Sequence, residues 1–74
     1  MNKTIKTVKE NIKKHSNDLN WLLCNLLGAT EIAEIAYLKN ELKTFMEGMS
    51  IIALYRNAIK KHEIYSRETG VKYE

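Results

Sequence analysis

The 74-residue chain contains no proline, one cysteine and only three glycines. Without proline, no helix is interrupted by a ring that lacks a backbone N–H group. A single cysteine excludes a disulfide within one chain and fits a reducing compartment, so we expect a cytoplasmic protein. No apolar run approaches the ~18 residues of a membrane-spanning helix, and no apolar signal stretch follows residues 1–6. These absences favour a helical domain that does not use a membrane.

The chain also has little excess charge, because 12 basic and nine acidic residues leave a net charge of +3. Most of the basic residues are lysine, which binds phosphate and base edges less specifically than arginine. Lys, Asn and Ile together make up a third of the sequence, a bias typical of AT-rich genomes and their phages. The composition is therefore compatible with a phage-like accessory protein.

Two of the glycines begin the same short sequence, Gly28-Ala29-Thr30 and Gly48-Met49-Ser50. Glycine adopts the left-handed conformation that ends a helix, and a following Thr or Ser can cap the next one. The third, Gly70, follows the last periodic segment. The glycines therefore predict helix ends near residues 28, 48 and 70.

Three segments have the periodicity of amphipathic helices, over about residues 3–27, 31–47 and 51–67. The stripe of the first consists of Ile5, Val8, Ile12, His15, Leu19, Leu22 and Leu26. The stripe of the second consists of Ile32, Ile35, Leu38, Leu42, Phe45 and Met46. The stripe of the third consists of Ile51, Leu54, Tyr55, Ala58, Ile59, His62 and Tyr65. We expect one all-α domain over residues 1–74, a small three-helix bundle with 68–74 as a frayed tail.

Two of these boundaries have an alternative. Ser16-Asn17-Asp18 favours caps and turns, so the first helix could restart there instead of bending. A helix that continued through Gly48 would merge the second and third helices into one bent helix. We favour a break at Gly48, because it lets the stripes on both sides reach one core.

No residue pattern indicates catalysis, a metal site or a cofactor. His15, His62 and Cys24 are the best ligand or nucleophile types, and none belongs to a paired motif. Cys24 lies in an apolar stretch, and His15 falls within an apolar stripe, so structural roles are favoured. The chain is also short for enclosing a substrate pocket beside a core. We therefore expect a protein that is not an enzyme.

The aromatic residues indicate a binding partner. Trp21 and Tyr37 fall outside the apolar stripes of their helices, and Leu23 and Leu27 make the end of the first helix apolar almost all round. A core of this size supplies only about 3–5 kcal/mol, so additional apolar surface favours a partner chain. We expect a homodimer, and the interface hypothesis assigns Trp21, Leu23, Leu27 and Tyr37 to contacts with that second copy or with another protein. The function predicted is a small non-catalytic regulator or inhibitor that covers a site on a larger protein.

The alternative function is nucleic-acid binding. The basic side chains concerned are Arg56, Lys60, Lys61 and Arg67, together with the N-terminal lysines Lys3, Lys6, Lys9, Lys13 and Lys14. No predicted helix combines the Arg, Asn and Gln side chains that distinguish base edges. A solvated polar face is therefore the favoured interpretation of these residues.

Overall fold

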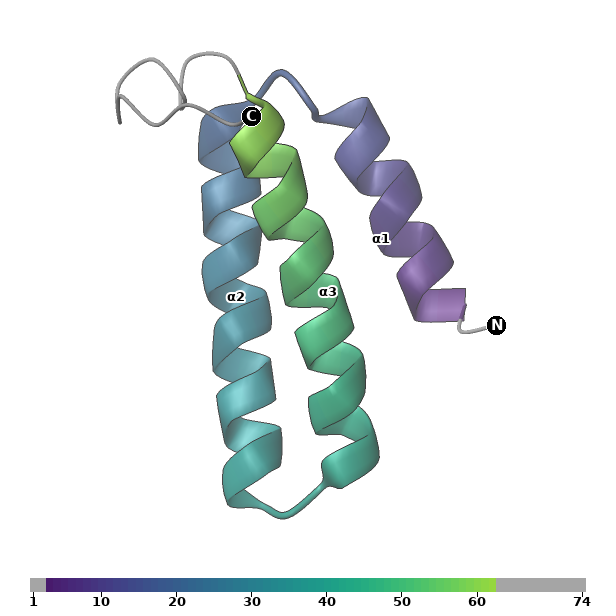
Figure 1. Ribbon diagram of the computed structural model, residues 1–74, viewed down its shortest axis with the longest axis vertical. Coiled ribbons are helices and arrows are strands. Elements are labelled where there is room, and N and C mark those ends of the chain that lie inside the picture. Colours follow the sequence, from purple (N-terminus) through teal and green to yellow (C-terminus); the bar gives the residue numbers. More distant parts are fainter. Residues whose placement is uncertain (1–2, 63–74) are drawn as a thin grey trace.

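The computed structural model describes residues 3–62, which form three helices: α1 (Lys3–Lys14), α2 (Leu19–Leu38) and α3 (Leu42–Lys61). Helices α2 and α3 form an antiparallel hairpin, and α1 packs mainly against α3 (Figure 1). Helix α1 is the shortest and does not reach the closed end of the hairpin (Figure 1). The prediction of an all-α three-helix bundle is confirmed, although the predicted helix boundaries are not.

The predicted first helix, residues 3–27, is wrong because the chain leaves the helix after Lys14. Asp18 has an extended backbone with φ −106° and ψ 92°, and it is the N-cap of α2. Its Oδ1 accepts a hydrogen bond from the backbone N–H of Trp21 at 3.0 Å. The cap supplies a partner for a free N–H group of the first helical turn. This local bond outweighs the apolar spacing that continues through the sequence.

The second boundary lies at residues 39–41, inside the predicted helix 31–47. Asn40 has a positive φ of 62°, which asparagine tolerates better than most residues. The backbone N–H of Glu41 donates to Ala36 O at 2.8 Å, and that of Asn40 donates to Tyr37 O at 3.1 Å. This bond pair is a Schellman motif, with asparagine in the position that glycine usually occupies. The chain therefore turns at Asn40, and the predicted end at residue 47 is wrong.

Gly28 and Gly48 both lie inside helices, so the prediction that they end helices is also wrong. The hydroxyl groups that follow them do not cap new helices. Thr30 Oγ1 donates to Leu26 O at 2.8 Å, and Ser50 Oγ donates to Met46 O at 3.3 Å. The helix runs through Gly48, as in the alternative interpretation, but α2 and α3 do not merge because of the turn at residues 39–41.

Gly48 allows α2 and α3 to approach closely. A Cβ atom at this position would lie 3.0 Å from Ala33 Cβ and 3.4 Å from Ala33 Cα. Ala33, Ala36 and Gly48 are all buried, so small residues form the contact between the helices near the turn. At Gly28, by contrast, an added Cβ would have no neighbour within 4 Å.

The large buried side chains lie at the opposite end of the hairpin, which we call the core end. Leu22, Tyr55 and Ile59 form the buried cluster, with 0%, 6% and 4% of their surfaces exposed. Partly buried side chains of α1 pack against it, including those of Val8 and Ile12. Three helices therefore contribute to the core end.

His62 fixes the loop between α1 and α2 to the end of α3. It is the C-cap of α3, and its Nε2 lies 3.2 Å from the backbone oxygen of Asn17. A carbonyl oxygen can only accept, so Nε2 holds the proton and donates it. The other ring nitrogen, Nδ1, is buried and has no hydrogen-bond partner among the described residues. Predictions for Tyr65, Arg67, Gly70 and the tail 68–74 lie outside the described residues.

Candidate functional site

Trp21, the main residue of the interface hypothesis, is half-buried at the core end. Its indole ring stacks on the His15 imidazole, with centroids 4.3 Å apart and an angle of 19° between the planes. Its other ring contact is with Tyr55, at 6.0 Å and 60°. Since His15 follows α1 and Tyr55 belongs to α3, Trp21 connects α2 to α3 and to the loop after α1. These contacts give the indole a structural role within a single chain.

The four residues predicted to bind a partner do not form one surface. Trp21 and Tyr37 lie near opposite ends of α2, about 24 Å apart along its axis. Leu23 is half-buried and lies beside Arg56 and Lys60, whereas Leu27 is 66% exposed. Tyr37 is 63% exposed near the turn. Only part of the predicted set is therefore available to another molecule.

The largest group of exposed apolar side chains lies at residues 32–49, which we call the hairpin tip. The exposed large apolar residues of the described chain are Leu27, Ile32, Ile35, Tyr37, Leu38, Leu42, Met46 and Met49. All of them except Leu27 belong to the hairpin tip. Most of the stripe predicted to face the core from residues 31–47 is therefore exposed, which corrects that prediction.

Five residues of the hairpin tip are neighbours by one ring contact and by helical spacing, and we call them the tip patch: Tyr37, Leu42, Phe45, Met46 and Met49. The rings of Tyr37 and Phe45 are 5.4 Å apart and join α2 to α3. On α3, Leu42, Met46 and Met49 follow i, i+4, i+7 spacing and therefore share a face. Phe45 is a neighbour of both Leu42 and Met49 on that helix, at i+3 and i−4.

The sequence contains one sign of the tip patch that apolar periodicity does not reveal, namely a residue that favours a turn. Ala33, Ala36 and Gly48 are the buried residues of the hairpin tip, and all are small. The apolar spacing of residues 32–46 continues across the turn, so it indicates one helix with one core-facing stripe. Asn40, a favourable C′ residue between Lys39 and Glu41, was the available sign of a turn.

The predicted nucleic-acid-binding residues lie on different surfaces. Arg56 and Lys60 line a shallow hollow with Leu23. Lys61 instead lines a cleft between α1 and α3 with Lys9 and Lys13. Lys6 and Lys14 are exposed outside this cleft, and the Lys3 side chain and Arg67 lie outside the described structure. The predicted basic residues of α3 therefore lie on two surfaces. Only Lys61 shares a surface with predicted lysines of α1.

The remaining reactive side chains are Cys24, the possible metal ligands and Tyr55. Cys24 is exposed, although its apolar sequence neighbours suggested burial. Within residues 3–62, no three His, Cys, Asp or Glu side chains gather closely enough to hold a metal ion. Burial raises the pKa of the Tyr55 phenol above its ordinary value of about 10, because the charged form would lose its water.

Comparisons with protein-family models, with curated proteins and with solved structures find no match to this chain. By length and composition alone, α2 is apolar enough to cross a membrane, with a mean hydropathy of 1.2 over its best window. This property does not test the expectation of a domain that does not use a membrane, because α2 also contains the charged residues Glu31 and Glu34. Core helices of soluble proteins and signal sequences have the same property, so a single helix of this kind is weak support for membrane insertion.

Proposed function

We propose that this chain is a non-catalytic protein-binding module and that the tip patch is its docking surface. The observation on which the proposal rests is the distribution of side-chain size at the hairpin tip. Small residues occupy the inside, and Leu42, Met46 and Met49 point outward with 60%, 68% and 48% of their surfaces exposed. Contiguous exposed apolar surface of this kind marks interaction sites in soluble proteins.

The residue types of the tip patch suit an interface. Tyr, Phe and Met are enriched at the centres of protein interfaces, and flexible methionine side chains adapt to a partner's shape. Charged side chains of the hairpin tip, such as Glu41, Lys43 and Glu47, would supply the polar rim around that centre. A small regulator or inhibitor that covers a site on another protein is the role that such a surface supports.

The first partner to test is a second copy of the chain, because an apolar patch that packs against its own copy gives a symmetric dimer without another component. We expect the wild type to show concentration-dependent association in analytical ultracentrifugation under reducing conditions. Met46→Lys should weaken that association about tenfold or more, since it places an ammonium group in the apolar contact. Because Met46 is 68% exposed, the variant should keep its fold.

The matched control is Cys24→Lys, which makes the same charge change at an exposed residue of α2. Cys24 lies about 20 Å along α2 from Tyr37, so its substitution should leave association unchanged. Equal effects of both variants would indicate a general charge effect and contradict docking through the tip patch. A second contradicting result is flotation of the wild type with neutral phosphatidylcholine vesicles, if Met46→Lys abolishes it. That result would assign the tip patch to a lipid surface.

A further inference from the structure

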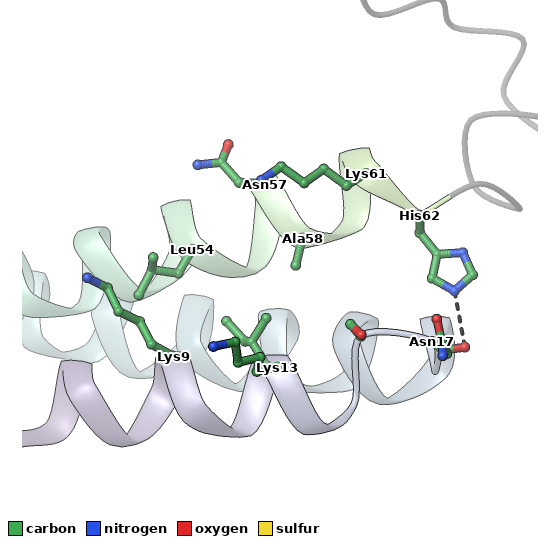
Figure 2. A pocket seen from close by; sticks show the side chains of 10 residues that line it. Lys9, Lys13, Asn17, Leu54, Asn57, Ala58, Lys61 and His62 are labelled. Atoms are coloured by element: carbon green, nitrogen blue, oxygen red, sulfur yellow. Dashed lines mark hydrogen bonds between the residues drawn. The ribbon is translucent and has the colours of Figure 1, made fainter.

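The cleft between α1 and α3 is separate from the tip patch. It has a volume of about 830 Å³ and is lined on one side by Lys9 and Lys13 of α1. Asn57 and Lys61 line the other side from α3. In Figure 2, Lys9 extends from α1 toward α3, Lys13 stays close to α1, and Lys61 runs along α3 above Ala58.

The polar groups of this cleft favour a negative ligand. Three lysine side chains line it, and no carboxylate does among the residues that the structure describes. Like charges brought together repel one another, and an anion between them would remove that repulsion. Ser16, Asn17 and Asn57 add neutral side chains that can donate hydrogen bonds to anion oxygens.

The apolar part of the cleft limits the kind of anion. Ile12, Leu54 and Ala58 lie among the polar residues and supply low-polarity contacts next to the charges. The only ring in the described lining is His62, whose Nε2 is already bonded to Asn17. No Phe, Tyr or Trp in that lining offers the stacking surface on which proteins place unpaired bases. The lining therefore suits phosphate oxygens better than bases.

The spacing of the lysines indicates more than one phosphate group. Lys9 and Lys13 are one helical turn apart, about 6 Å along α1, and Lys61 lines the same cleft from α3. Lysine binds phosphate as a mobile point charge, so three such groups match a short chain of linked phosphates. The volume also lies within the ~300–1,000 Å³ of typical small-ligand sites.

We propose that the cleft between α1 and α3 binds a small ligand with two or three linked phosphate groups. Such a ligand would join the lysines of α1 to Lys61 of α3 and hold α1 against the hairpin. Binding to the folded state alone would then raise the melting temperature. This site is independent of the tip patch, so neither proposal requires the other.

The test uses inorganic tripolyphosphate as the probe and the full chain as the protein. Calorimetry should show saturable binding to the wild type, and the double variant Lys9→Gln, Lys61→Gln should bind about tenfold more weakly or worse. The control double variant Lys14→Gln, Lys39→Gln removes the same two charges outside the cleft and should bind like the wild type. Circular dichroism of each variant checks that the helices remain formed.

Three results would overturn the proposal. The first is the absence of saturable tripolyphosphate binding to the wild type at low salt. The second is an equal loss of affinity in both double variants, which would indicate attraction to net charge alone. The third is binding of a single-stranded oligothymidylate without binding of tripolyphosphate, which would assign the lysines to a nucleic-acid backbone.

Discussion

The two ends of the α2–α3 hairpin use apolar residues in opposite ways. At the core end, Leu22, Tyr55 and Ile59 are buried, and α1 and Trp21 pack around them. At the hairpin tip, Ala33, Ala36 and Gly48 are inside, and the large side chains are outside. The difference follows from α1, which covers the hairpin only at the core end (Figure 1). A third helix allows large side chains to be buried, whereas two helices alone meet through small ones.

The largest predicted difference between the two ends comes from truncating one large apolar side chain at each of them. Leu22→Ala should cost about 2–5 kcal/mol of the free energy of unfolding, because Leu22 is fully buried and a cavity remains. Met46→Ala should change it by less than about 0.5 kcal/mol, since Met46 is already solvated in the single chain. Urea unfolding followed by circular dichroism at low protein concentration measures both values.

Similar losses from the two substitutions would show that the hairpin tip is buried in solution even at the lowest concentration measured. A small loss for Leu22→Ala would instead contradict the assignment of the core end. Repeating the Met46→Ala measurement at high concentration separates the two states, because a dimer adds stability that increases with concentration.

Replacing the two helical glycines by alanine should change the stability by intermediate amounts. The two changes should have opposite signs. Gly28→Ala should stabilise the protein by about 0.5–1 kcal/mol, because alanine favours the helix and the added Cβ meets no neighbour within 4 Å. Gly48→Ala should destabilise it by about 1 kcal/mol, since the added Cβ would lie 3.0 Å from Ala33 Cβ and overpack the contact. Thermal unfolding of the two variants gives the comparison, and a gain in stability at both positions would show that α2 and α3 separate without cost.

The smallest predicted effect concerns the pH dependence of stability at the core end. Burial raises the pKa of Tyr55 in the folded state, so above pH of about 10 the unfolded state loses its phenolic proton first. The stabilising contribution of the neutral phenol is therefore fully present below that pH and is lost as the pH rises through the folded-state pKa. Urea unfolding between about pH 8 and about pH 11 should show a steeper loss of stability for the wild type than for Tyr55→Phe. Parallel curves would contradict the role of burial.

The sequence was sufficient for the class of fold and for much of the core end. Val8, Ile12, Leu22, Tyr55 and Ile59 all belong to predicted stripes, and the structure packs them together. The helix ends were harder to predict, because caps depend on one or two hydrogen bonds. Asp18 and Asn40 formed such caps, whereas the hydroxyl groups of Thr30 and Ser50 bonded back to their own helices.

The candidate surfaces were predicted less well than the fold. Tyr37 was expected at an interface and is exposed in the tip patch, but Trp21 has its ring contacts inside the bundle. Leu42 and Met46 were expected in the core, and the turn at Asn40 places them outside. Lys9 and Lys61 are 52 residues apart in the chain, so only the packing of α1 on α3 brings them to one cleft.

The amino-acid sequence by itself determined that the protein is helical, because apolar spacing and the absence of proline act within each segment. Only the tertiary structure decided which apolar residues are buried, since a face of a helix becomes buried only when another helix covers it. For the same reason, Gly48 became a point of close contact between helices, and the large side chains of the hairpin tip remained exposed.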